Sequence, residues 1–125
     1  MRTEQETVNE YEVLVHLARA VPLSEEIVQI GASREVSNGW HDVSPGEVDG
    51  KVGLIHLGPG CHAELQHWMG HLVKGAIVLM EHYWPGSEAY VYAIDLAARG
   101  YITSLSEARN WRGLGVATFI GKDHS

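Results

Sequence analysis

Apolar side chains recur every three or four residues near the start of the chain, a spacing that predicts an amphipathic helix over residues 4–20. Thr3 and Glu6 form a capping box at the start of this helix, and Pro22 ends it. A second short helix is predicted over residues 25–30, because Ser24 suits an N-cap and Gly31 suits a helix stop. The chain therefore opens with two predicted helices. The apolar positions of the first are Val8, Tyr11, Leu14, Leu17 and Val21.

The pattern changes after residue 31, where Asn-Gly, Pro-Gly and Asp-Gly dipeptides mark tight turns. Short strands are predicted between these turns, at residues 35–37, 40–43 and 51–57. A helical period returns over residues 61–74 and predicts a central helix. Continuous apolar runs at 76–84 and 89–96 predict two interior strands joined by a hairpin at 85–88. A short helix capped by Ser104 or Ser106 and running through Trp111, followed by a strand over 115–120, completes the prediction.

These elements predict one α+β domain over residues 1–125, with a mixed sheet of about four or five strands, two N-terminal helices and one central helix. A chain of 125 residues with 45% hydrophobic residues is long enough to bury a single core. No apolar stretch approaches the length of a membrane span, and the first residues do not resemble a signal peptide. We therefore expect a cytoplasmic protein that does not contact membranes.

Charge divides the chain into an acidic part, residues 1–49, and a neutral part, residues 50–125. The acidic part holds ten acids and three arginines, so the whole net charge of −7 lies there. Such a surface disfavours direct nucleic-acid binding and favours a basic protein partner. We expect an acidic interaction protein, an inhibitor or regulator that docks on a nucleic-acid-handling protein, as phage-type anti-defence proteins do. The expected contact residues are Glu4, Glu6, Glu10, Glu12, Glu25, Glu26 and Trp40.

Trp40 joins this set because it follows an Asn-Gly turn, and amphipathic aromatic residues are common at interfaces. The C-terminal arginines Arg99, Arg109 and Arg112 complement the acidic part of the chain. Pairing between the two parts in different copies makes a homodimer an alternative to a foreign partner.

Histidine is abundant, with eight residues in the chain and four of them between residues 56 and 71. If residues 61–74 form a helix, Glu64, His67 and His71 lie on one side of it. A carboxylate and two imidazoles so arranged are suitable ligands for Zn²⁺ or Fe²⁺. A metal-dependent enzyme is therefore an alternative to the interaction protein.

Several segments share their order with a known family. His16 in a first element, a short helix ending at Gly31, apolar segments at 53–57 and 90–96, and Arg99-Gly100-Tyr101 follow one another along the chain. This layout resembles compact ADP-ribosyltransferase-like domains. The resemblance implies NAD as cofactor, His16 as a residue that contacts NAD, and Glu107 as the catalytic glutamate.

Other common catalytic motifs are absent from the sequence. There is no phosphate-binding loop, no Rossmann glycine fingerprint and no Gly-x-Ser-x-Gly turn. The single cysteine, Cys61, fits a small apolar residue better than a catalytic thiol. The sequence thus favours an interaction protein without a cofactor, and leaves open an enzyme that uses either a metal or NAD.

Overall fold

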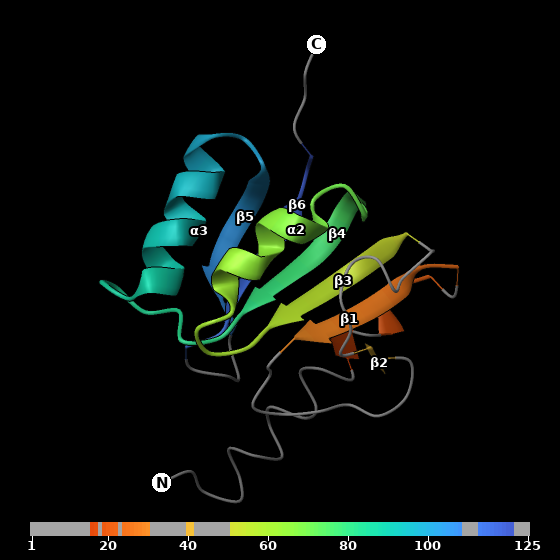
Figure 1. Cartoon of the computed structure of the whole chain (residues 1–125), viewed down its shortest axis with the longest axis horizontal. Helices are drawn as coiled ribbons and strands as arrows, with labels where there is room; N and C mark the ends of the chain where they lie inside the picture. The colour runs from red at the N-terminus through yellow and green to blue at the C-terminus, as the bar shows by residue number, and fades with distance from the viewer. Residues whose placement is uncertain are drawn as a thin grey trace, which may run out of the picture.

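The computed structural model describes residues 16–17, 19–22, 24–30, 40–41, 51–108 and 113–121. These residues form a mixed β-sheet with helices packed on it (Figure 1). The elements, in chain order, are β1 (Glu26–Ile30), β2 (Trp40–His41), β3 (Val52–Leu57), η2 (His62–Glu64), α2 (Leu65–Trp68), β4 (Leu72–Met80), α3 (Glu88–Ala98), β5 (Ile102–Glu107) and β6 (Gly115–Phe119).

The strand order in the sheet is β2-β1-β3-β4-β6-β5. Strands β2, β1, β3 and β4 are parallel to their neighbours. Strand β6 is antiparallel to both β4 and β5, so β5 runs in the same direction as β4. The sheet is therefore a parallel one into which a single antiparallel strand is inserted, next to the last position.

Strand β3 lies at the centre of the parallel part, and all six of its residues are buried. Both of its faces are covered, as parallel sheets require. On one face, Leu65 and Trp68 of α2 and Leu96 of α3 join the larger core cluster. On the other face, Leu17 and Val21 pack against a smaller cluster of Leu54, Leu79 and Leu114.

Residues 25–30 were expected to be helical, and this prediction is wrong because Glu26–Ile30 form β1. The segment contains Ile27, Val28 and Ile30, whose β-branched side chains suit a strand packed on both faces. Backbone pairing with β2 and β3 on either side then outweighs the capping signals of Ser24 and Gly31.

The central helix over residues 61–74 is also corrected. Only η2 and the one-turn helix α2 form there, and Leu72 already begins β4. The apolar run at 89–96 is helix α3 rather than a strand, so there is no hairpin at 85–88. The hydroxyl of Ser87 accepts a hydrogen bond from the Tyr90 backbone N–H at 3.0 Å and so starts this helix instead.

A helix after Ser104 was expected, but residues 102–107 form β5. The prediction of a mixed sheet with helices is confirmed, as are the strands that became β3 and β6. The strand expected at 35–37 and most of the helix expected at 4–20 lie outside the described residues. Within the described part, no helix is both long enough and apolar enough to span a membrane.

Gly115 provides a test of the packing at the start of β6. A Cβ atom at this position would lie 2.7 Å from Cγ of Tyr83 and 2.8 Å from Cδ1 of the same ring. We expect Gly115→Ala to lower the free energy of unfolding by about 1–3 kcal/mol, the usual cost of overpacking a core. Gly70→Ala is the matched control, because a Cβ there has nothing within 4 Å. Urea unfolding of both variants measures the effect, and equal losses would contradict the packing described.

Tyr83 also makes stability depend on pH. Burial, followed by the nearby Tyr90 and Glu107, raises the pKa of the Tyr83 phenol above its ordinary value of 10.0. The unfolded chain then loses this proton at a lower pH than the fold does, so the free energy of unfolding falls as the pH rises past about 10. We expect Tyr83→Phe to reduce this fall. Thermal unfolding from about pH 8 to about pH 11 measures it, and identical pH profiles for the two proteins would exclude this role.

Candidate functional site

Three polar residues stand at the carboxyl ends of neighbouring parallel strands. Gln29 and His56 are paired in register on β1 and β3, and each is the last residue but one of its strand. Glu81 directly follows β4, two residues beyond Leu79, the register partner of His56. Because side chains alternate along a strand, all three point to the face that carries Leu54 and Leu79.

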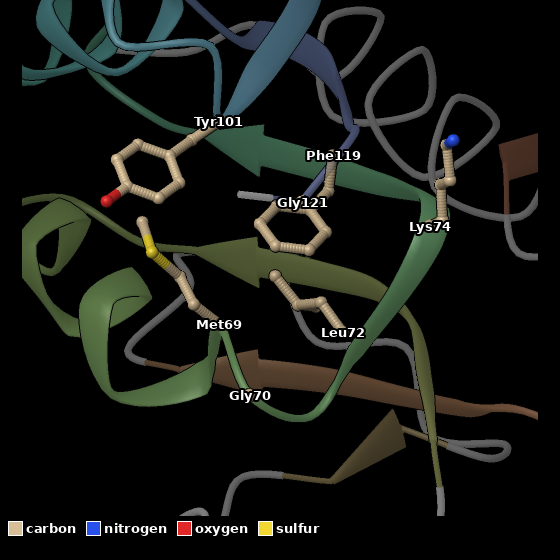
Figure 2. Close-up of a pocket in the computed structure, with 7 residues that line it drawn as sticks. All are labelled: Met69, Gly70, Leu72, Lys74, Tyr101, Phe119 and Gly121. Atoms are coloured by element: carbon tan, nitrogen blue, oxygen red, sulfur yellow. The ribbon is translucent and has the colours of Figure 1, made fainter. Parts of the chain in front are cut away.

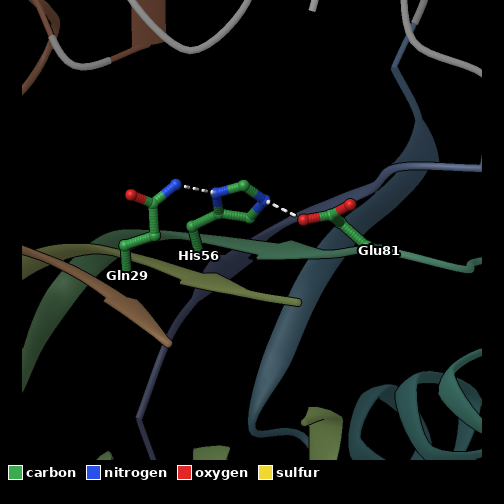
Figure 3. A network of polar contacts seen from close by, with 3 residues as sticks. All are labelled: Gln29, His56 and Glu81. Carbon is green, nitrogen blue, oxygen red and sulfur yellow. Dashed lines mark hydrogen bonds and ion pairs between the residues drawn. The ribbon is translucent and has the colours of Figure 1, made fainter. Parts of the chain in front are cut away.

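The three side chains form one connected row, the Gln29–His56–Glu81 network (Figure 3). Nε2 of Gln29 lies 3.0 Å from Nδ1 of His56, and Nε2 of His56 lies 3.0 Å from Oε2 of Glu81. The relative exposures are 5% for Gln29, 0% for His56 and 4% for Glu81. They are the buried polar or charged residues of the described part of the chain, in an otherwise apolar interior.

The order of donors and acceptors fixes the tautomer of His56. Nε2 of the Gln29 amide can only donate, so Nδ1 of the His56 ring is the acceptor. The ring proton of neutral His56 is then on Nε2, which faces the Glu81 carboxylate. That contact has the distance of an ion pair but not the alignment of a hydrogen bond. Both ring nitrogens are thus engaged, and the ring is held in one orientation.

Backbone hydrogen bonds hold the strand ends around this network together. The Gly58 N–H donates to the Ile30 carbonyl at 2.8 Å, which joins the end of β3 to the end of β1. The Glu81 N–H donates to the Leu57 carbonyl at 2.9 Å, which joins β4 to β3. The network therefore lies on a rigid edge of the sheet.

The same edge contains the switch point of the sheet. Strand β1 lies between β2 and β3, so the two strands that follow it in the chain lie on opposite sides of it. In open parallel sheets, ligands bind beyond the carboxyl ends of the strands at the place where the strand order reverses. Gln29 and His56 flank that place, and the segments 58–61 and 81–87 leave the sheet there.

His82 carries backbone strain beside the network. Its φ of 60° is in the left-handed region, which non-glycine residues rarely adopt. The side chain is exposed, and its ring centroid lies 4.9 Å from that of Trp84 with an interplanar angle of 32°. Trp84 is itself 48% exposed. An imidazole and an indole are therefore displayed to solvent immediately after the strand that ends at the network.

A hollow lies at the opposite, amino edge of the parallel strands (Figure 2). It has a volume of about 510 Å³ and lies among Leu72 at the start of β4, Phe119 at the end of β6, and Tyr101 before β5. Met69 and Lys74 also line it. It contains no buried charged group and lies at the edge where parallel sheets do not usually bind ligands. The carboxyl edge is the stronger candidate for that reason.

The metal site expected from Glu64, His67 and His71 is not assembled. The helix that would align these residues ends at Trp68, so Glu64 lies in η2 and His71 in the turn before β4. In the described ranges, no three His, Cys, Asp or Glu side chains are grouped as metal ligands would be. The residues whose sequence spacing suggested a Zn²⁺ or Fe²⁺ site are therefore not grouped in the fold as ligands of one metal ion.

The two residues implied by the ADP-ribosyltransferase resemblance are placed separately. His16 is exposed and helical, whereas Glu107 is the last residue of β5. Oε2 of Glu107 accepts a hydrogen bond from the Gly113 N–H at 2.7 Å. Its observed contact thus joins the last residue of β5 to Gly113, shortly before β6, and the NAD assignment stays a prediction.

Most of the acidic residues expected to bind a partner lie outside the described residues, namely Glu4, Glu6, Glu10 and Glu12. Glu25 and Glu26 are described, and both are half-buried. The side chain of Glu25 lies over Gly53, at a position that a Cβ on this glycine would occupy. Trp40 begins β2 by its backbone, and its side chain is outside the description.

Sequence reasoning missed Gln29, His56 and Glu81 as a group. Gln29 and His56 each stand one residue before the end of an apolar run, at 27–30 and 54–57, and Glu81 directly follows the run at 76–80. A lone polar residue at this place in a buried strand was the available signal. This signal does not identify the group, because the sequence predicts a helix over residues 25–30 and contains nothing that places β4 beside β3.

No family model, no curated protein and no solved structure matches this chain. The site therefore has to be interpreted from its own geometry.

The network predicts a stability cost for losing its first member. Gln29→Leu keeps a similar volume but removes the amide that donates to Nδ1 of His56. We expect the free energy of unfolding to fall by about 1–3 kcal/mol, the cost of removing one partner of a buried polar group. Gln66→Leu is the matched control at an exposed position. Urea unfolding of the two variants makes the comparison, and a loss at residue 29 no larger than at residue 66 would contradict the network.

Proposed function

We propose that the protein binds a nucleoside-type cofactor at the carboxyl edge of its parallel sheet, above the switch point between β1 and β3. The observation that carries this proposal is the buried Gln29–His56–Glu81 network, which lines the ends of three adjacent parallel strands. Doubly wound sheets bind nucleotides and dinucleotides at this place. The strand order suggests a nucleotide-like cofactor by analogy with other sheets of this kind. The charge of the site narrows the choice among such cofactors.

The segments leaving β3 and β4 carry little that would attract phosphate. Residues 58–61 and 81–87 contain no lysine or arginine, and the sequence has no glycine-rich phosphate loop. Glu81 instead supplies a carboxylate at the edge. A ligand with phosphates would meet no compensating charge from these two segments. A cationic ligand without phosphates suits them better.

The ligand should therefore be a nucleoside that is cationic and has no phosphate. An adenosine that carries a positively charged sulfonium, as in S-adenosylmethionine, meets both requirements. The exposed Trp84 and His82 rings offer a surface on which a purine can stack or a cation can rest. Such a cofactor supplies an activated methyl group when bound. The exposed imidazole of His82 is then the group that we expect to accept a proton from a methyl acceptor.

The network has a supporting role in this proposal. Nδ1 of His56 accepts from Gln29, so the ring carries its proton on Nε2. That N–H faces the Glu81 carboxylate at 3.0 Å. Holding the carboxylate in place before a ligand arrives lowers the cost of ordering it on binding. Glu81 is thus the positioning charge, and His82 and Trp84 are the groups expected to touch the ligand.

Isothermal titration calorimetry tests the ligand class directly. We expect S-adenosylmethionine to bind more tightly than S-adenosylhomocysteine, which has the same adenosine but no sulfonium charge. We also expect no measurable binding of ATP or NAD at the same concentration. Tighter binding of NAD would instead favour the ADP-ribosyltransferase resemblance. Absence of binding by all four compounds would overturn the proposal.

A charge-neutral substitution tests the part played by Glu81. We expect Glu81→Gln to weaken S-adenosylmethionine binding about tenfold, equivalent to about 1.4 kcal/mol, while S-adenosylhomocysteine binding changes little. Asp95→Asn is the matched control, because it removes a carboxylate that is 54% exposed on α3. Circular dichroism verifies that both variants fold. Equal weakening of the two ligands would show that Glu81 does not sense the sulfonium.

The acidic residues of the first 49 positions support a second proposal, docking on a basic protein. The charge asymmetry that motivates it is a property of the sequence, and the proposed contact residues are mostly outside the described part. Reversal of Glu6 and Glu10 to lysine is expected to abolish such docking and to leave cofactor binding unchanged. A co-purified partner retained by the double variant would contradict this role of the acidic surface.

A further inference from the structure

Helix α3 is apolar on both sides. Ala89, Ala93 and Leu96 are buried against the sheet. On the outer side Val91 is 61% exposed and Ile94 is 45% exposed. A surface helix is normally polar on its outer side, and a helix that is apolar all round is normally covered on both sides. Among the described residues, Val91 and Ile94 therefore form an exposed apolar patch on the outer side of α3.

A narrow stripe runs along this helix through the exposed residues Val91, Ile94 and Ala98, and the half-buried N-cap residue Ser87 stands at its start. Their spacing of four, three and four residues places them within about 60° of one another around the axis. The buried residues Ala89, Ala93 and Leu96 lie on the opposite side by the same count. The stripe has the spacing of a helix-packing seam.

The stripe is complementary to itself. It reads small, large, large, small along the chain, so it has the same outline in either direction. In an antiparallel pair of helices related by a twofold axis between residues 92 and 93, Val91 of each copy meets Ile94 of the other. Ser87 and Ala98 meet in the same way at both ends, and the small residues let the helix ends approach. Isologous contacts of this kind are the commonest in homodimers.

The charged residues beside the stripe agree with the antiparallel direction. Glu88 lies in the first turn of α3 and Arg99 directly follows its last residue. Antiparallel packing brings Glu88 of one copy close to Arg99 of the other, whereas parallel packing brings like charges together. Within one copy Arg99 contacts Asp95 at 3.1 Å, and both side chains are more than half exposed. The guanidinium is therefore accessible to a second carboxylate.

We propose that the outer side of α3 is the interface of a homodimer, in which two α3 helices pack antiparallel through Val91 and Ile94. This surface lies on the helix layer, away from the face of the sheet that carries the Gln29–His56–Glu81 network (Figure 1). The proposal is therefore independent of the proposed cofactor. It also gives the partner a definite identity, a second copy of this chain.

Sedimentation velocity over a range of protein concentrations tests the interface. We expect the native chain to form dimers and the double variant Val91→Glu, Ile94→Glu to be monomeric at every concentration examined. His67→Glu is the matched control, because it adds a carboxylate at an exposed position on α2. The control variant is expected to dimerise as the native chain does. A monomeric native chain, or a double variant that still dimerises, would overturn the proposal.

Disulfide trapping tests the direction of the helices, in a Cys61→Ala background. A mixture of Val91→Cys and Ile94→Cys chains is expected to give a covalent heterodimer on oxidation. Ala98→Cys alone is expected to give none, because the two copies of residue 98 would be about 16 Å apart along the axis at a rise of about 1.5 Å per residue. A disulfide requires Cα atoms within about 7 Å. Efficient crosslinking of Ala98→Cys would show parallel packing and overturn the antiparallel arrangement.

Discussion

The complete burial of β3 is the constraint on which the rest of the structure depends. A strand with parallel neighbours on both sides and apolar cover on both faces has no route to water for any polar group. Each polar side chain on it must find its partner inside the protein. His56 is the ionisable residue of β3. Gln29 of β1 and Glu81, which follows β4, are the partners of its two ring nitrogens. The network thus also specifies which strands lie beside β3 and in which register.

The network and the helix layer divide the two faces of the sheet between different tasks. The face covered by α2 and α3 is closed by the larger apolar cluster, with no buried charge among its described members. The other face has a smaller cluster and carries the polar row at its carboxyl edge. Chemistry proposed at that edge and self-association proposed at α3 therefore impose separate requirements on the sequence. A substitution that satisfies one requirement has little effect on the other.

Sequence patterns predicted the presence of several strands better than they predicted which strands lie side by side. The runs that became β3 and β6 were visible because continuous or alternating apolar residues have few alternatives to a strand. Residues 26–30 and 88–98 were misassigned in opposite directions, since a short apolar run does not distinguish a helix from a buried strand. The candidate site escaped prediction for a different reason. Gln29, His56 and Glu81 are far apart in the chain, and only the strand order brings them together.

The insertion of β6 between β4 and β5 has a consequence for how the chain folds as it is synthesised. Strand β5 has no sheet partner in the described part of the chain other than β6. When α3 and β5 leave the ribosome, β4 still has an open edge, and β5 cannot pair with it in its native position. Residues 115–119 must arrive and enter the gap before either edge is closed. The described sheet is therefore completed from its interior by β6, the last of its strands in chain order, and until then β4 presents unpaired backbone groups to other chains.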